Sequence, residues 1–294
     1  MMIKRRLYQF AKAGFAGVVL VVLLLGTSGQ AFGQQTRSPE PAASETPTEA
    51  SSEEAQEKDL SKQATDKGTN EVTFRPRIQL SYVHRDSRSS SVTDRAILRL
   101  DRPLLDGRLY FRVDVPYQWF DSNQPGGTTS NGFGDVYVRT GVRLLHRPKF
   151  SLFAGVNARF PSGDADDHLG RGKYQVGPIV AATVPVPALN MVFSPIVEDF
   201  QSVGGDPSQP KASYTRFSLR MDMPKLEEWW AYIQPRWIVD WTKSNKTALN
   251  LEFEGGRKLG EHYRAWVKPA VGFWGDGVAG SYNWQLEAGV RYMF

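Results

Sequence analysis

The stretch RLYFRVDVPYQWF, residues 108–120, alternates apolar and polar side chains, with Val113 and Val115 in one series and Arg112 and Asp114 in the other. Successive side chains of a β-strand point to opposite faces, so the stretch predicts a strand with one apolar and one polar face. In a soluble sandwich the apolar face packs into a core, whereas in a membrane barrel it meets lipid and the polar face lines a lumen. This stretch alone leaves both architectures open.

The same alternation recurs along residues 72–294, for example in VTFRPRIQLSYVH (72–84) and FGDVYVRTGVRLL (133–145), and LNLEFE (249–254) is part of another such run. These runs are about ten to thirteen residues long, whereas strands of globular proteins average about five or six. Crossing a bilayer at a tilt requires the longer length. Their polar faces also carry Arg, Asp and Glu in mid-strand. The lengths therefore favour a membrane barrel.

The connections between these runs differ systematically in length. Long polar segments (RDSRSSS, DSNQPGGTTSNG, PSGDADDHLGRG and SVGGDPSQPK) follow the odd-numbered strands, and short turns such as HRPK and KLGEH follow the even-numbered ones. Long loops at one end and tight periplasmic turns at the other are typical of outer-membrane barrels. We therefore predict an all-β fold, a transmembrane up-and-down antiparallel β-barrel of about 12 strands over residues 71–294. The expected location is the outer membrane of a Gram-negative bacterium.

The N-terminal part of the chain is predicted to lie outside the barrel. Residues 1–33 combine a basic start, the apolar run FAGVVLVVLLLG and the small-residue segment TSGQAFG, which is the layout of a secretory signal. The run is shorter than the roughly 18 residues of a membrane-spanning helix, so an N-terminal anchor is the less favoured alternative. Residues 34–70 contain almost no large apolar side chains and predict a disordered periplasmic tail. A plug, a partner-binding arm or a short helix over residues 53–64 are the alternatives.

Charge and cysteine content exclude several classes of protein. The formal net charge is +5, but Lys4, Arg5, Arg6 and Lys12 lie in the predicted signal. Removing these four of the 36 basic residues leaves 32 against 31 acidic ones, a net charge of +1, so the charge is no argument for nucleic-acid binding. The absence of cysteine excludes a disulfide framework and an acylated lipoprotein terminus.

The C-terminal stretch SYNWQLEAGVRYMF, residues 281–294, alternates in the same way and ends on an aromatic residue. It resembles the C-terminal signature by which the barrel-assembly machinery recognises outer-membrane proteins. The candidate residues for this signal are Phe294, Tyr292 and Val290. Amphipathic rings at strand ends predict two aromatic girdles at the level of the lipid headgroups: Tyr82, Trp119, Phe120, Trp229, Trp230, Trp241, Tyr263, Trp274, Tyr282 and Trp284.

Two segments, residues 132–145 and 159–185, resemble the outer-membrane transporter family named for the MetA pathway of phenol degradation. They contain a G-D-V strand start, a P-S-G-D segment where the family has P-T-G-D, and a G-x-G-x-Y-x-x-G-P strand. The matching residues are Pro161, Ser162, Gly163, Asp164, Gly170, Gly172, Tyr174, Gly177 and Pro178. The resemblance covers about a quarter of the chain. It implies a barrel that passes small, often hydrophobic or aromatic, compounds, and it identifies no binding residues.

The alternation places many charged side chains in the lumen. The basic ones are Arg75, Arg77, Arg95, Arg99, Arg112, Arg139, Arg143, Arg159, Arg216, Arg220, Arg236, Arg264, Lys268 and Arg291. The acidic ones are Asp101, Asp114, Asp135, Glu198, Asp240, Glu252, Glu254 and Glu287. An excess of basic side chains would favour anionic solutes. Alternatively, the charges pair across a nearly closed lumen, because a small barrel can be filled by its own side chains.

From this set we select candidates for setting solute selectivity, together with the loop at residues 161–172. They are Arg112, Asp114, Arg139, Arg143, Arg159, Arg220, Arg236, Glu252, Glu254, Arg264, Lys268 and Arg291.

No catalytic or metal-binding pattern stands out. The acidic group around Asp164, Asp166 and Asp167 matches no calcium-binding spacing and is interpreted as an exposed loop. A nucleophile needs a base and an orienting group within hydrogen-bond reach, and His84 beside Asp86 and Ser87 provides only adjacency in sequence. We expect no enzyme activity, no cofactor and no metal, and keep a hydrolase with its site near His84 as an alternative.

Together these observations predict a monomeric outer-membrane channel for passive uptake of small solutes, either hydrophobic and aromatic or anionic. The expected partners are outer-membrane lipid and lipopolysaccharide, the barrel-assembly machinery and the small-molecule solute, with no nucleic acid. A closed structural barrel whose tail binds a partner is a further alternative.

Overall fold

The computed structural model describes residues 49–68, 70, 72, 74–88, 91–226 and 228–294. The chain divides into two compact units, Met1–Ser52 and Glu53–Phe294, and the fold described below belongs to the second. The predicted signal at residues 1–33 and the first part of the predicted tail lie outside the described residues. None of the helices formed by the described residues is long and apolar enough to cross a membrane.

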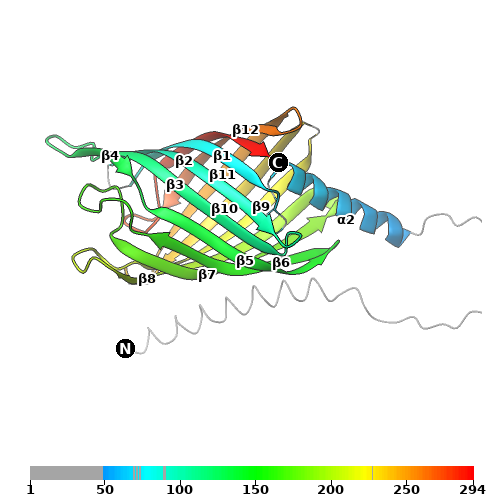
Figure 1. Ribbon diagram of the computed structural model, residues 1–294, viewed down its shortest axis with the longest axis horizontal. Coiled ribbons are helices and arrows are strands. Elements are labelled where there is room, and N and C mark those ends of the chain that lie inside the picture. Colours follow the sequence, from blue (N-terminus) through cyan, green and yellow to red (C-terminus); the bar gives the residue numbers. More distant parts are fainter. Residues whose placement is uncertain (1–48, 69, 71, 73, 89–90, 227) are drawn as a thin grey trace, which may run out of the picture. The chain divides into compact units, whose positions relative to one another are not determined.

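Twelve antiparallel strands close into a barrel, as predicted (Figure 1). Each strand pairs with its neighbour in the chain, β1 also pairs with β13, and Arg77 at the start of β1 lies opposite Met293 near the chain end. The ring consists of β1 (Arg77–Asp86), β2 (Val92–Leu104), β3 (Leu109–Asp121), β5 (Val136–Arg147), β6 (Phe150–Phe160), β7 (Lys173–Val186), β8 (Met191–Gly205), β9 (Ser213–Leu226), β10 (Trp229–Asp240), β11 (Lys246–Leu259), β12 (Tyr263–Trp274) and β13 (Trp284–Met293).

One further strand, β4 (Thr129–Phe133), lies outside the ring. The first part of β3 pairs with β5 as far as Asp114 opposite Tyr137, and its last part pairs with β4 from Tyr117 opposite Phe133. β3 and β4 therefore continue as a two-stranded hairpin, which projects beyond the other strands in Figure 1.

The burial of successive residues follows the predicted alternation. In β1, Leu80 is 59% exposed on the outside, whereas Gln79 is 2% exposed on the inside. In β3, Phe111 and Trp119 point outward, and Arg112 is buried. Apolar side chains thus cover the outer wall and polar side chains line the interior, which is the arrangement of a membrane barrel and not of a sandwich.

The connections give the barrel two different ends. Short turns join β2 to β3, β5 to β6, β7 to β8, β9 to β10 and β11 to β12, and we call this the inner end. The longer connections, including residues 161–172, 206–212 and 275–283, lie at the outer end. The turn between β2 and β3 contains four residues, 105–108, with positive φ angles at Leu105, Asp106 and Gly107.

The prediction of disorder for residues 34–70 is wrong for the described part of that segment. Residues Glu49–Asp66 form helix α2, which includes the short helix considered as an alternative. The segment is ordered because Leu60 and Ala64, one helical turn apart, are fully buried in a cluster with Val192 of β8. Composition did not reveal this contact, because only two apolar side chains make it.

The first strand is also shorter than predicted. β1 begins at Arg77, so Val72 and Phe74 do not lie on the lipid-facing side of a strand. Both pack instead against buried residues of the barrel interior. Arg75, predicted to line the lumen, precedes the strand and binds Asp66 (Nη1–Oδ1 3.2 Å) and the carbonyl oxygen of Phe294.

Candidate functional site in the barrel lumen

The barrel encloses a cavity of about 490 Å³, lined by residues of the strands and of the outer loops. Gly68, Arg77 and Gln79 line its inner part, and residues 168–171 and 279–280 line its outer part. The lining contains thirteen basic side chains: Arg77, Arg85, Arg95, Arg99, Arg112, Arg139, Arg159, Arg171, Arg216, Arg220, Arg236, Lys268 and Arg291. It contains six acidic ones: Asp114, Asp135, Glu198, Glu252, Glu254 and Glu287.

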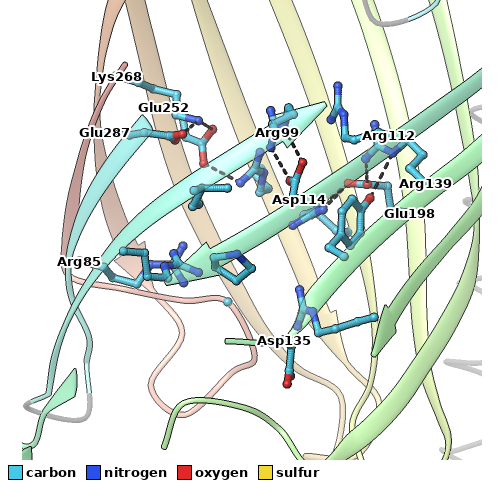
Figure 2. A pocket seen from close by; sticks show the side chains of 18 of the residues that line it. Arg85, Arg99, Arg112, Asp114, Asp135, Arg139, Glu198, Glu252, Lys268 and Glu287 are labelled. Atoms are coloured by element: carbon cyan, nitrogen blue, oxygen red, sulfur yellow. Dashed lines mark hydrogen bonds and ion pairs between the residues drawn. The ribbon is translucent and has the colours of Figure 1, made fainter. Parts of the chain in front are cut away.

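Most of the basic side chains form ion pairs within the wall. Arg99 of β2 and Asp114 of β3 make a bidentate pair, with both N–O distances at 2.7 Å. Glu198 of β8 accepts from Arg139 of β5 at 2.5 Å (Figure 2). It also accepts from Arg216 of β9 at 2.5 Å. These guanidinium–carboxylate pairs join strands that do not all neighbour one another, so they brace the barrel across its interior.

A second group of pairs lies on β10 to β13. Glu252 accepts from Arg236 at 2.5 Å, and Lys268 bridges Glu252 (3.9 Å) and Glu287 (2.5 Å), which Figure 2 shows side by side. Glu254 is held by Arg291 at 2.9 Å, and it also accepts from the Trp230 indole and the Tyr232 hydroxyl, both at 3.0 Å. The hypothesis that lumen charges pair with one another is therefore correct for these residues.

Near the inner end, Asp101 binds two arginines and a tyrosine. Its carboxylate accepts from Arg77 at 2.5 Å and Arg112 at 2.6 Å, and the Tyr110 hydroxyl also donates to it. The carboxylate is 1% exposed, so its charge is neutralised by two buried cations and not by water.

Four arginines of the lining have no carboxylate partner among the described residues: Arg85, Arg95, Arg159 and Arg171. We call them the arginine cluster. All four are half-buried, and each lies near the outer end of its strand or in an outer loop. Arg85, which lies apart from the labelled ion pairs in Figure 2, donates to the Gln285 side chain, and Arg159 donates to Gln175. The Arg95 Nε is buried without any hydrogen-bond partner among the described residues.

The members of the arginine cluster lie close enough to repel one another. Arg85, Arg159 and Arg171 all act electrostatically on Arg95. In the loop, burial lowers the pKa of Arg171, and the neighbouring Arg159 lowers it further. Glu287 acts on Arg95 in the opposite sense, and Asp135 and Asp240 act on Arg171, but none of these carboxylates forms an ion pair with the arginine cluster. The outer part of the lumen therefore has an excess of basic side chains over ion-paired carboxylates.

The loop at residues 161–172 folds against the wall and contributes His168, Leu169, Gly170 and Arg171 to the cavity lining. Asp135, just before β5, holds both ends of this loop. Its carboxylate accepts from the backbone N–H of Gly163 at 3.3 Å and from that of Arg171 at 2.9 Å. Burial raises the pKa of Asp135, and these backbone N–H groups oppose the rise.

Side chains close the loop against β3 and β4. Ser162 Oγ donates to the carbonyl oxygen of Gly134 at 3.0 Å, and Gln118 donates to the carbonyl oxygen of Leu169. A side chain at Gly170 would meet the Gly163 carbonyl oxygen at 2.3 Å, so this approach requires glycine. The loop position is therefore determined by the chain itself, and Arg171 is carried into the lumen.

Comparisons with known proteins agree with this geometry. Residues 62–202 match a family model described as "Putative MetA-pathway of phenol degradation". An outer membrane channel from Pseudomonas putida F1 is similar over 75% of this chain and 96% of its own, with 12% identity and a TM-score of 0.58. The NanC porin is similar over 74% of this chain and all of its own, with 12% identity and a TM-score of 0.53. The chain therefore shares the β-barrel fold of these outer-membrane proteins.

At 12% identity these solved structures establish the shared barrel fold. No curated protein sequence matches the chain. Within the family match, the residues that carry the sequence resemblance surround the loop at residues 161–172: Asp135 anchors it, and Gly163 and Gly170 allow its ends to approach closely. The family motif therefore encodes the loop that borders the lumen.

Ten of the twelve residues predicted as selectivity candidates line the cavity: Arg112, Asp114, Arg139, Arg159, Arg220, Arg236, Glu252, Glu254, Lys268 and Arg291. Arg143 and Arg264 do not. Arg143 lies at the inner rim and donates to the Asp106 carbonyl oxygen in the β2–β3 turn. Arg264 is 3% exposed and donates to the carbonyl oxygen of Asp66 at the end of helix α2. Alternation gives the face of a side chain, but not its depth in the barrel.

Sequence reasoning left three members of the arginine cluster out of the candidates. Arg95 was placed in the lumen but not selected, since nothing in the sequence shows which arginines lack a partner. Arg85 continues the inward series of β1, so extending the alternation by one step would have found it. Arg171 lies in a loop, where periodicity gives no information.

Two residues assigned to the aromatic girdles lie inside the barrel. Trp230 is 2% exposed and donates to Glu254, and Tyr282 is 1% exposed and lies under the Arg85 guanidinium. Trp229, next to Trp230, is 54% exposed on the outer wall as predicted. Adjacent aromatic residues in a strand must face opposite sides, which is why only one of this pair can contact lipid.

The histidine considered for catalysis has an acidic neighbour. His84 Nδ1 lies 2.8 Å from Asp94 Oδ1, and its ring packs against Trp284. Among the described residues, no serine or threonine hydroxyl is hydrogen-bonded to His84. The pair lies on the outward-facing side of β1, with Leu80 and Tyr82, and not in the cavity. The described residues also contain no cluster suited to a metal ion.

Proposed function

We propose that this protein is a passive outer-membrane channel for small solutes and that it favours anions. The observation that carries the proposal is the arginine cluster: Arg85, Arg95, Arg159 and Arg171 border the outer part of an enclosed cavity and form no ion pair with a carboxylate among the described residues. Rings of arginine in a pore attract anions and repel cations. The low-dielectric barrel wall strengthens this field within the lumen.

The arginines of the lining fall into an ion-paired group and an unpaired group, and this difference supports the proposal. Paired arginines such as Arg99 and Arg139 have their charge neutralised by Asp114 and Glu198, so they stabilise the wall. The four arginines of the cluster keep their charge available to a passing solute. Because the family is named for phenol degradation, small aromatic compounds that carry a carboxylate are the subclass we would test first.

The test uses the purified protein in planar lipid bilayers with a potassium chloride gradient. The reversal potential should show preference for chloride over potassium. In Arg95→Gln/Arg171→Gln the ratio of anion to cation permeability should fall by about tenfold, because two unneutralised charges are removed. Neither guanidinium donates a hydrogen bond among the described residues, so the substitutions leave the wall intact.

Arg143→Gln is the matched control, since Arg143 lies outside the cavity lining. It should leave the reversal potential unchanged. A wild-type channel that prefers potassium, or a double variant with unchanged selectivity, would contradict the role of the arginine cluster. A barrel that conducts no ions under any condition would favour the closed structural barrel.

We also propose that the protein functions as a monomer in a Gram-negative outer membrane, in contact with lipid and lipopolysaccharide. Val290, Tyr292 and Phe294 would serve as the signal for the barrel-assembly machinery. Val290 and Phe294 are 46% and 51% exposed on the outer wall, where such a partner could contact them.

A further inference from the structure

Three arginines of the cluster lie opposite glutamine side chains in the barrel wall. These cross-strand pairs are Arg85 with Gln285, Arg95 with Gln118 and Arg159 with Gln175. Elsewhere in the lumen, other basic side chains have a carboxylate at the equivalent position: Arg99 with Asp114, Arg112 with Asp101 and Lys268 with Glu287. A glutamine oxygen accepts a hydrogen bond but carries no charge, so the glutamine pairs leave the arginine charge in place.

Two of these glutamines position an arginine without neutralising it. Gln285 Oε1 accepts from both Nε and Nη2 of Arg85, at 2.8 and 2.6 Å. Gln175 Oε1 accepts from Arg159 Nη1 at 3.2 Å. Both arginines line the cavity. Because a guanidinium group has five N–H donors, each of them keeps donors that a solute can use.

Arg95 is the member of the cluster with an unsatisfied buried donor. Gln118, opposite Arg95, donates instead to the carbonyl oxygen of Leu169 in the loop at residues 161–172. The Arg95 Nε is buried and has no hydrogen-bond partner among the described residues. A buried N–H without an acceptor lowers stability. A ligand in the cavity would be the acceptor that this guanidinium group lacks.

Arg159 and Arg171 cover two neighbouring aromatic rings. The Arg159 guanidinium lies 5.8 Å from the Phe200 ring centroid, and that of Arg171 lies 5.9 Å from the Tyr214 centroid. The two rings stack on each other with a centroid distance of 5.0 Å. Phe200 is 1% and Tyr214 is 4% exposed, whereas both arginines are half-buried. A solute in this part of the cavity therefore meets guanidinium groups and not the faces of these rings.

The carboxylates that act electrostatically on the cluster are bound elsewhere. Glu252 and Glu287 each bind another basic side chain at 2.5 Å. Asp240 accepts from two backbone N–H groups of the outer loops, at 3.0 and 3.3 Å, and Asp135 holds the loop at residues 161–172. Repulsion among the four arginines is therefore relieved most by a ligand that brings more than one negative charge.

We propose that the arginine cluster is a binding site for one compact divalent oxyanion, of the class of sulfate and hydrogen phosphate. The oxygens of such an ion match the planar N–H forks of arginine, which bind oxyanions in pairs of parallel hydrogen bonds. The inference rests on the channel function proposed above and deepens it, because it names a solute class that is recognised by charge and not by an aromatic ring. A monovalent anion offsets less of the repulsion among the arginines.

The first test measures binding of sulfate to the purified protein in a zwitterionic detergent at low salt. Isothermal titration calorimetry should show one saturable site, with sulfate bound more than about tenfold more tightly than chloride or benzoate. Gln175→Glu/Gln285→Glu keeps the oxygens that accept from Arg159 and Arg85 and adds a negative charge at each. This variant should bind sulfate about tenfold or more weakly, because two of the four arginines are then ion-paired.

The control adds the same two charges outside the cavity. Gln124 and Asn131 are exposed on the connection before β4 and on β4, and neither lines the cavity. Gln124→Glu/Asn131→Asp should leave sulfate binding unchanged, because solvent and salt screen exposed charges. Equal affinities of the wild type for sulfate and chloride would overturn the site. So would wild-type affinity in the Gln175→Glu/Gln285→Glu variant, once heat-modifiable migration on gels shows that it is folded.

The Arg95→Gln/Arg171→Gln variant gives an independent result, since it removes two guanidinium groups and adds no charge. It should also bind sulfate about tenfold or more weakly, and wild-type affinity would contradict the site.

The second test separates the site from the channel. In planar bilayers, sulfate should reduce the chloride current at the concentrations at which it binds, and the Gln175→Glu/Gln285→Glu variant should lose this inhibition. Anion-selective current that sulfate does not inhibit would overturn the site and leave the channel function. Saturable sulfate binding by a protein that conducts no ions would overturn the channel function and leave the site.

Discussion

At the scale of single residues, Asp135 shows how one carboxylate positions a whole loop. It lies between β4 and β5 and binds backbone N–H groups at both ends of the loop at residues 161–172. Removal of a partly buried carboxylate that accepts two hydrogen bonds lowers stability, because both N–H donors lose their acceptor. Asp135 is therefore a positioning residue for Arg171 and does not itself attract an anion.

Asp135→Ala should loosen this loop by about 1–3 kcal/mol, because two backbone N–H groups lose their acceptor. The measurement is limited trypsin digestion of the folded protein: cleavage after Arg171 should become faster, and channel current should become noisier. Asp167→Ala, in the same loop but exposed, should leave both unchanged. Equal digestion rates for Asp135→Ala and the wild type would show that other contacts hold the loop.

At the scale of secondary-structure elements, the strands are held by hydrogen-bonded ladders and by ion pairs across the lumen. Arg291 of β13 and Glu254 of β11 belong to strands that do not neighbour each other in the ring. Both side chains are almost fully buried. The Trp230 indole and the Tyr232 hydroxyl also donate to the Glu254 carboxylate. Removing one partner of such a pair leaves the other charge buried and unneutralised.

Glu254→Gln should therefore destabilise the barrel by about 3–5 kcal/mol. The midpoint of urea unfolding, followed by tryptophan fluorescence in detergent, measures the effect. Asp276→Asn provides the comparison, since Asp276 pairs with Arg88 at 3.1 Å but its side chain is 84% exposed. An exposed pair contributes about 0–1 kcal/mol, so this variant should unfold near the wild-type midpoint. Similar midpoints for both variants would contradict the bracing role of the Glu254 pair.

At the scale of the whole molecule, the closed ring exposes a continuous apolar wall. Leu80, Val156, Val267 and Val290 are each between 44% and 59% exposed, on four different strands. In water such a surface would associate, whereas hydrocarbon solvates it at no cost. The ring also pairs each of its twelve strands with a neighbour on both sides, whereas β4, outside the ring, pairs only with β3. A bilayer does not tolerate unpaired strand edges.

Val156→Arg, near the middle of β6, should cost about 2–4 kcal/mol of stability in a bilayer, because it places a charge at mid-membrane depth. Val203→Arg, at the outer end of β8, should cost only about 0–1 kcal/mol. Reversible unfolding in lipid vesicles compares the two. Equal effects would show that the apolar wall does not span the hydrocarbon as assigned.

The alternating pattern alone determined the class of fold, the number of strands and the face of most side chains. These predictions succeeded because successive side chains of a strand point to opposite faces. Arg112 could therefore be assigned to the inner face and Val113 to the outer face without knowledge of the neighbouring strands. The length of the strands, and the contrast between long connections at one end and short turns at the other, then indicated a membrane barrel. The motif at Asp135 and residues 161–172 likewise marked a loop whose position the structure explains.

Only the tertiary structure decided which arginines are neutralised, how deep each one lies and where the chain goes before β1. Arg95 and Arg99 lie on the same face of β2, yet only Arg99 binds a carboxylate. The reason is the register with β3, which places Asp114 opposite Arg99 and Gln118 opposite Arg95. Val72 and Phe74 occupy the even-numbered positions that face lipid in β1, but they precede that strand and pack against buried residues of the barrel interior. Whether a position is odd or even is a local property of the chain, whereas charge pairing and the burial of Val72 and Phe74 depend on contacts between segments far apart in the chain.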